Sequence, residues 1–211
     1  MRVTAITKQR REGHVNLHLD GRFALGLTLD ALAAAGLRAG DEIGDDTLRS
    51  LQRDAAGADA LAAAMRLLSY RPRSEAELRQ RLARRGAPPE LVDGAISRLR
   101  DLGLVDDAAF ARTWVEGRSR LSPRSRRLLR RELQAKGIHG EAAREALAPL
   151  DDADAALRAG ERRAAALKAL PYAEFRRRLS DFLRRRGFDP ATVHRAVEQL
   201  RQAHGVSASD R

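Results

Sequence analysis

The sequence predicts a mainly α-helical protein of three tandem three-helix repeats, preceded by a small N-terminal β-hairpin and short helices. Three observations predict this fold class. The core of this 211-residue chain must come mainly from alanine, leucine and valine, because aromatic residues make up only 4%, and the first two favour helix. Alternating apolar residues are confined to the first 27 positions. An apolar pattern around a glycine occurs three times, about 50 residues apart.

The N-terminal segment alternates between apolar and polar side chains, which is typical of half-buried strands. We expect strands at Val3–Thr7, Val15–Leu19 and Phe23–Leu27, with a tight turn at Asp20–Gly21. A lone hairpin is marginally stable in water, so this sheet of two or three strands should pack against the following helix.

Two short helices are expected after the sheet. The first spans Asp30–Ala35, and the second begins with Asp45 or Asp46 as its N-cap and ends near Ala55. Gly57 then marks the boundary of the N-terminal unit.

The internal repeat is defined by five positions around a glycine. Two leucines precede the glycine by eight and four positions, and two apolar residues follow it by ten and thirteen. The three copies are Leu78, Leu82, Gly86, Ile96 and Leu99; Leu129, Leu133, Gly137, Leu147 and Leu150; and Leu179, Leu183, Gly187, Val197 and Leu200. Leucines four apart lie on one helix face, and the glycine ends that helix in a left-handed cap.

A further helical run precedes each leucine pair, so every repeat has three helices. These runs are Ala58–Tyr70, Asp107–Arg120 and Ala153–Leu170. The expected domain limits are 1–56 for the N-terminal unit, 57–104, 105–152 and 153–204 for the repeats, and 205–211 for a frayed tail.

Capping signals support the helix boundaries. Ser74 and Glu77 form a capping box, Asp106 or Asp107 caps the run that follows it, and Asp189 precedes a proline suited to the first helical position. Ser122–Pro123 is interpreted in the same way, as the start of the second repeat's middle helix.

Composition and motifs exclude several classes of protein. The chain has no cysteine, which excludes disulfides and thiol chemistry and fits a reducing compartment. No apolar run approaches the ~18 residues of a membrane span. We therefore expect a cytoplasmic protein that does not enter membranes. Phosphate-loop, dinucleotide-binding and zinc-protease motifs are absent.

Acidic pairs and histidines offer little for catalysis. Asp106–Asp107 and Asp151–Asp152 could serve as acid/base groups or metal ligands, but each precedes a helical run, where carboxylates cap free amides. His14 and His18 lie on a turn and a strand, without a third ligand nearby. We expect no catalytic residue, metal or cofactor, and the protein is not predicted to be an enzyme.

The basic residues are the feature of the sequence that points to a function. The formal net charge is +11, and three nearly one-signed clusters cover the helix before each repeat glycine. This recurrence favours a polyanion-binding surface over a merely solvated face. The residues predicted to contact a partner are Arg81, Arg85, Arg118, Arg120, Arg124, Arg126, Arg127, Arg130, Arg131, Lys136, Arg177, Arg184 and Arg185.

Trp114 is the single tryptophan of the chain and shares a helix face with Phe110. Tryptophan is enriched at binding hot spots, so Trp114 could anchor an interface. The shared apolar face favours packing between repeats 1 and 2 for both residues.

Several segments together resemble the RecX family of RecA regulators. They are AAAMRLLSYRPRSEAELRQRL (62–82), LGLVDDAAFARTWVEGRSR (102–120), RELQAKGI (131–138) and FLRRRGF (182–188). The resemblance implies an elongated, curved array of three repeats that binds along the groove of the RecA–single-stranded DNA filament. It also implies modulation, mainly inhibition, of filament growth, ATP hydrolysis, strand exchange and SOS-repressor cleavage. A monomer is expected, with RecA and single-stranded DNA as partners and weaker contact to duplex DNA.

Two alternatives remain at this stage. Three-helix units with a tight turn resemble helix-turn-helix modules, so the chain could be a stand-alone DNA-binding protein. A nuclease that uses the aspartate pairs is the second alternative.

Overall fold

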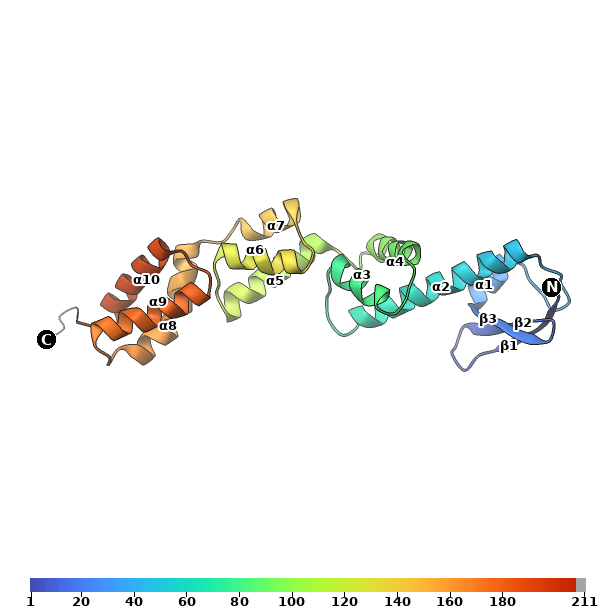
Figure 1. Cartoon of the computed structure of the whole chain (residues 1–211), viewed down its shortest axis with the longest axis horizontal. Helices are drawn as coiled ribbons and strands as arrows, with labels where there is room; N and C mark the ends of the chain where they lie inside the picture. The colour runs from blue at the N-terminus through green and yellow to red at the C-terminus, as the bar shows by residue number, and fades with distance from the viewer. Residues whose placement is uncertain (208–211) are drawn as a thin grey trace. The chain divides into compact units, whose positions relative to one another are not determined.

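The computed structural model describes residues 1–207 and confirms a mainly α-helical fold (Figure 1). The described part contains three strands and ten helices. In order they are β1 (Val3–Lys8), β2 (His14–Leu19), β3 (Arg22–Thr28), α1 (Leu29–Ala34), α2 (Asp45–Leu68), α3 (Glu75–Ala83), α4 (Pro89–Asp101), α5 (Asp107–Leu121), α6 (Arg126–Ala135), α7 (Gly140–Leu147), α8 (Asp152–Leu167), α9 (Tyr172–Arg185) and α10 (Pro190–Ala203). They form two compact units, one up to Val105 and one from Asp106.

The N-terminal strands form one antiparallel sheet in the order β1-β2-β3. Val15 pairs with Leu27 and Leu17 with Leu25, and all four side chains are buried. The predicted turn at Asp20–Gly21 is confirmed, with φ of 48° and 79° at its two residues. Positive φ at both central residues is the turn geometry that matches the twist of two antiparallel strands.

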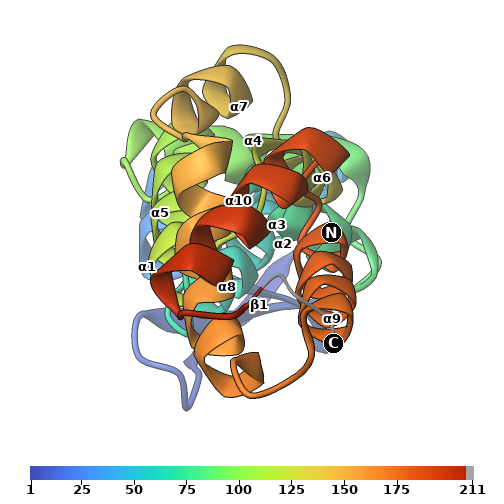
Figure 2. The same ribbon diagram turned by 90° about the vertical axis from the view of Figure 1, so that its left-hand side faces the viewer.

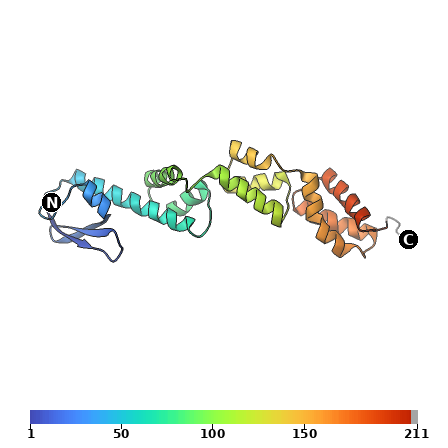
Figure 3. The ribbon, with the colours of Figure 1, turned by 180° about the vertical axis from the view of Figure 1, so that it is seen from behind.

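Helix α2 is one continuous helix of 24 residues (Figure 3). The prediction that this helix ends near Ala55 is wrong, because it continues through Gly57 to Leu68. Its first half buries Leu51 in the core of the sheet, and its second half buries Ala64 in the core of repeat 1. A glycine inside a helix costs about 1 kcal/mol. The free energy gained by burying apolar side chains of α2 on both sides of Gly57 outweighs this cost.

Each repeat follows the predicted three-helix plan: α2–α4, α5–α7 and α8–α10. The repeat glycines Gly86, Gly137 and Gly187 end the middle helices with φ of 81°, 77° and 88°. This left-handed backbone favours glycine because it has no Cβ. The leucine pairs before the glycines form the centres of the three cores and are at most 1% exposed: Leu78, Leu82, Leu129, Leu133, Leu179 and Leu183.

Aspartates cap the helices that open repeats 2 and 3, as predicted. Asp106 Oδ1 accepts hydrogen bonds from the amides of Ala108 (2.8 Å) and Ala109 (2.9 Å). Asp151 Oδ1 accepts from the amide of Ala153 at 2.7 Å. These carboxylates therefore satisfy backbone donors that a helix start leaves free.

The predicted start of α6 at Ser122–Pro123 is wrong. Ser122 ends α5, and Ser125 caps α6 by accepting a hydrogen bond from the amide of Leu128 at 3.1 Å. Ser125 and Ser74, the N-cap of α3, both stand twelve positions before their repeat glycine. Alignment of the repeats on their glycines therefore indicates Ser125 as the N-cap, whereas Pro123 suggested an earlier start.

The described beginning of the predicted tail packs on repeat 3. The tail was predicted to fray from residue 205, but Val206 is 5% exposed and packs on the core of repeat 3. Its amide donates to the Arg201 carbonyl at 3.0 Å, and its carbonyl accepts from Arg201 Nη1 at 3.1 Å. Residues 208–211 of that predicted tail lie outside the described residues. Within 1–207, no helix combines the length and apolarity needed to cross a membrane.

Candidate nucleic-acid interface

Helix α6 buries one face and exposes four arginines. Leu129 and Leu133 are fully buried on the core side. The exposed residues, which we name the α6 basic face, are Arg126, Arg127, Arg130 and Arg131. Neighbouring cations without interleaved carboxylates produce a positive potential that attracts phosphate groups.

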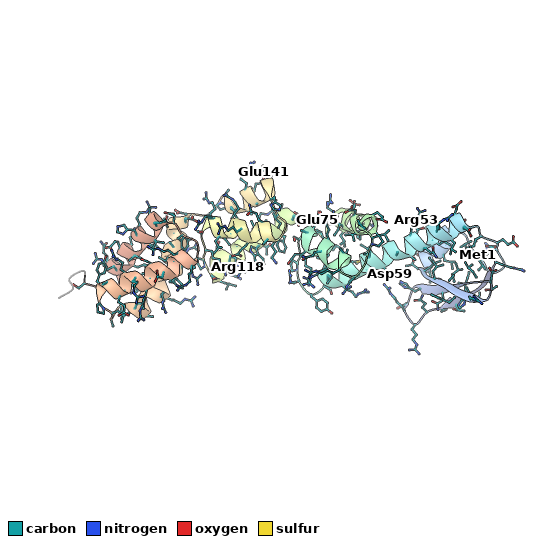
Figure 4. All side chains as sticks on the ribbon, in the orientation of Figure 1. Met1, Arg53, Asp59, Glu75, Arg118 and Glu141 are labelled. Carbon is teal, nitrogen blue, oxygen red and sulfur yellow. The ribbon has the colours of Figure 1, made fainter. Side chains whose placement is uncertain are left out.

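The one carboxylate of α6, Glu132, is turned toward α5 and holds a packed cluster. Its Oε2 accepts from Trp114 Nε1 and from Arg118 Nε, both at 3.0 Å, and its Oε1 accepts from Arg124. Lys136 Nζ lies 4.9 Å from the centre of the Trp114 ring. Three residues predicted to contact a partner, Arg118 (Figure 4), Arg124 and Lys136, therefore make structural contacts inside repeat 2.

Trp114 and Phe110 also pack within repeat 2. Their rings stack with centroids 6.0 Å apart and an interplanar angle of 16°, and both lie against the repeat 2 core. The Arg118 guanidinium lies 4.7 Å from the centre of the Trp114 ring, which is a cation–π contact. The predicted packing of this pair between repeats 1 and 2 stays a prediction.

Two arginines of the α6 basic face also contact neighbouring backbone. Arg126 Nη2 donates to the Leu150 carbonyl, and Arg127 Nη2 donates to the Gly187 carbonyl at 3.3 Å. Arg130 and Arg131 make no side-chain hydrogen bond or ion pair within residues 1–207, and the same holds for Arg120 on α5. These three guanidiniums are available to an external anion.

Helix α9 carries the corresponding residues of repeat 3. Arg177 lies 3.8 Å from Glu174 and Arg184 lies 3.7 Å from Asp181, distances beyond those of a normal hydrogen bond. Arg185 is exposed and has no side-chain partner in the described part of the chain. All three predicted residues are therefore accessible.

Repeat 1 differs because carboxylates neutralise its middle helix. Glu75 pairs with Arg100 at 3.0 Å and with Arg79 at 3.8 Å, and Asp93 also pairs with Arg79. The predicted contact residues Arg81 and Arg85 are exposed. The first unit has 17 basic and 14 acidic residues, against 23 and 15 in the second. The basic character thus lies mainly in repeats 2 and 3.

One basic cleft was missed by the sequence analysis. It has a volume of about 330 Å³ and lies between the α5–α6 turn and α8, lined by Arg158, Arg162 and Arg163. Leu121, at its edge, is 75% exposed. The adjacent Arg162 and Arg163 could have indicated this cleft from the sequence. They lie in the opening helix of repeat 3, whereas the predicted basic clusters lie in the middle helices.

Groups suited to metal binding do not gather in the described part of the chain. No group of three or more histidine, aspartate or glutamate side chains is arranged there so that it could hold a metal ion. The His14 ring contacts the Glu12 carbonyl (3.0 Å), and the His18 ring contacts the Thr7 hydroxyl (3.4 Å).

The fold and the α6 basic face define a tandem three-helix-repeat protein with an exposed arginine-rich helix face. Family models described as the first, second and third three-helix domains of RecX match residues 60–99, 106–147 and 151–197. The chain belongs to the RecX family.

Curated relatives agree with this assignment, and a solved structure agrees with the fold. Proteins named Regulatory protein RecX from Chlorobium limicola and Thermobifida fusca are 38% and 36% identical to this chain. The two matches cover 68% and 71% of this chain and 91% and 82% of the relatives. A crystal structure of regulatory protein RecX superposes with a TM-score of 0.75 at 23% identity, over 94% of this chain and 98% of the other.

Proposed function

We propose that this chain is a non-catalytic regulator that binds the RecA–single-stranded DNA filament. Binding along the filament groove limits filament growth and lowers RecA ATPase, strand exchange and SOS-repressor cleavage. The name of the relatives, Regulatory protein RecX, supports a regulatory role. The chain acts as a monomer in the cytoplasm, a reducing compartment that a cysteine-free sequence fits.

One observation carries the proposal of a nucleoprotein partner. The α6 basic face presents four arginines, while the only acidic residue of that helix, Glu132, is turned inward and occupied. A solvated helix normally balances its charges with partners three or four positions away. The imbalance on α6 is instead suited to an external polyanion such as a nucleic-acid backbone.

The test is a pull-down of the protein with RecA filaments formed on single-stranded DNA, together with RecA ATPase turnover. Arg130→Glu with Arg131→Glu should weaken filament capture at least about tenfold, since each lost charge-assisted contact is worth roughly tenfold. The matched control is Arg112→Glu with Arg144→Glu, which changes the charge of repeat 2 equally outside α6. Wild-type protein that neither binds filaments nor changes ATPase turnover at stoichiometric ratios would refute the proposal.

The second candidate is a stand-alone DNA-binding protein, which the compact three-helix units favour. It predicts duplex affinity with a sequence preference in the absence of RecA. Binding that is salt-sensitive but independent of sequence would argue against it.

A further inference from the structure

Repeat 3 contains a basic cleft between α9 and α10, the helices nearest the viewer in Figure 2. The cleft has a volume of about 430 Å³, so a phosphate group with part of its substituents fits inside. Its polar lining is Arg176, Arg177, Ser180, Asp181, Arg184 and His194.

Two of the three guanidiniums in this cleft form only long ion pairs, and the third forms none. Arg177 is 3.8 Å from Glu174, and Arg184 is 3.7 Å from Asp181. Both separations exceed hydrogen-bond length. Arg176 makes no side-chain hydrogen bond or ion pair within residues 1–207. None of the three guanidiniums therefore donates a hydrogen bond to a carboxylate within residues 1–207, although Asp181 lies in the cleft lining as a long ion-pair partner of Arg184.

At the equivalent positions of repeat 1, carboxylates of the same repeat pair with an arginine. Counting from the repeat glycines, Glu75 corresponds to Arg176 and Asp93 corresponds to His194. In repeat 1 both carboxylates pair with Arg79, which corresponds to Ser180. Repeat 3 thus has Arg176 and His194 where repeat 1 has these two carboxylates, and its cleft lining keeps a single carboxylate, Asp181.

Repeat 2 lacks both the two carboxylates of repeat 1 and the cleft residues. Arg126 occupies the position of Arg176, and Arg130 and Arg131 occupy those of Ser180 and Asp181. Its α6 basic face is a surface of accessible charge. Repeat 3 is therefore the place where guanidiniums, a hydroxyl and an imidazole surround one recess.

We propose that the α9–α10 cleft binds a phosphate group through Arg176, Arg177 and Arg184, and that this group belongs to a nucleic-acid backbone. The source of the phosphate rests on the proposed function. Planar guanidiniums match phosphate oxygens in paired hydrogen bonds. The Ser180 hydroxyl and the His194 ring provide further donors to the same group.

The test measures binding of labelled oligothymidine to the full chain by fluorescence anisotropy, without RecA. The variant is Arg176→Ala with Arg184→Ala, and the matched control is Arg178→Ala with Arg195→Ala, on the same two helices but outside the cleft lining. We expect at least about a tenfold loss of affinity for the variant and under about threefold for the control. The slope of log affinity against log salt should fall by about 1.4, at about 0.7 per contact.

Two further arms identify the source of the phosphate. An oligothymidine with uncharged methylphosphonate linkages should not bind, and inorganic phosphate should compete only at high concentration. Equal losses in variant and control, or no binding by wild type, would overturn the proposal. Tight binding of inorganic phosphate, with DNA affinity independent of Arg176 and Arg184, would overturn its assignment to nucleic acid. The anisotropy assay contains no RecA. If the expected losses of DNA affinity are found but the protein does not bind RecA filaments or change RecA ATPase turnover, only the proposed function is refuted.

Discussion

The Arg186 guanidinium donates a hydrogen bond to Ser122 Oγ at 2.9 Å, although the two residues are 64 positions apart. It also donates to the Pro123 carbonyl at 3.0 Å and lies 4.5 Å from the centre of the Phe182 ring. The Ser125 amide donates in return to the Arg186 carbonyl at 3.0 Å. Burial lowers the pKa of Arg186, and the nearby charge of Arg124 lowers it further. An arginine within a basic cluster therefore joins repeats 2 and 3.

Removing this guanidinium should destabilise the second unit. Arg186→Ala loses two charge-assisted hydrogen bonds, so the free energy of unfolding should fall by about 2 kcal/mol. Urea denaturation followed by circular dichroism measures the change. The control is Arg185→Ala, an exposed neighbour expected to change stability by less than about 0.5 kcal/mol. Equal effects of the two variants would show that Arg186 does not link the repeats.

The repeat glycines should differ in their tolerance of alanine. At Gly187 a Cβ would lie 2.6 Å from Ser125 Oγ and 2.7 Å from Leu128 Cβ, whereas at Gly86 it would meet nothing within 4 Å. Both residues have positive φ, so each alanine costs about 1–2 kcal/mol of backbone strain. Gly187→Ala should lose at least about 1 kcal/mol more through overpacking. Thermal unfolding of both variants measures the difference, and identical losses would contradict the close packing.

Glu132 should control both the stability of repeat 2 and the tryptophan signal. Glu132→Ala removes the acceptor shared by Trp114, Arg118 and Arg124 and should cost about 2–4 kcal/mol. Because Trp114 is the single tryptophan, its emission reports directly on this site and should shift as the indole loses its partner. Glu141→Ala, which removes an exposed carboxylate of α7 (Figure 4), is the control with unchanged emission. Unaltered emission in Glu132→Ala would refute the predicted coupling.

The Tyr172–Glu198 pair should give a stability that depends on pH at both ends. The Tyr172 hydroxyl donates to Glu198 Oε1 at 2.5 Å, which lowers the pKa of Glu198 below its ordinary 4.5 and raises that of Tyr172 above 10.0. A depressed carboxyl pKa contributes stability that is lost as the pH falls through it. A raised hydroxyl pKa contributes stability that is lost as the pH rises through it.

The corresponding measurement compares wild type with Tyr172→Phe across pH. Their difference in unfolding free energy should be largest between about pH 5 and pH 9 and should shrink outside that range. Tyr70→Phe, at a tyrosine that is 83% exposed, should show no such difference. A gap between wild type and Tyr172→Phe that stays constant from acid to alkaline pH would contradict the assigned hydrogen bond.

Local signals predicted most of the fold. The leucine pairs and Gly86, Gly137 and Gly187 define the repeats because buried spacing and left-handed caps are properties of a few neighbouring residues. Two errors arose where distant packing decides the outcome. Helix α2 continues through Gly57 because separate cores hold its two halves. Helix α6 starts after Ser125, its N-cap, whose amide donates to a carbonyl of repeat 3.

The basic surface was less predictable because an arginine has the same sequence signature whatever it contacts. Arg118 and Arg124 lie in the same cluster as Arg130 and Arg131, yet the first two hold Glu132 inside the fold. Which side of a helix faces another helix depends on tertiary contacts. Alignment of the repeats on their glycines is the one sequence signal that would have indicated the carboxylates of repeat 1.

Helix α2 is a stiff mechanical link. At about 1.5 Å per residue, its 24 residues span about 36 Å of unbroken backbone hydrogen bonding. One end is embedded in the core of the sheet and the other in the core of repeat 1, with no slack segment between them. A force applied to the sheet is therefore transmitted along α2 to repeat 1, so the sheet and repeat 1 should move together.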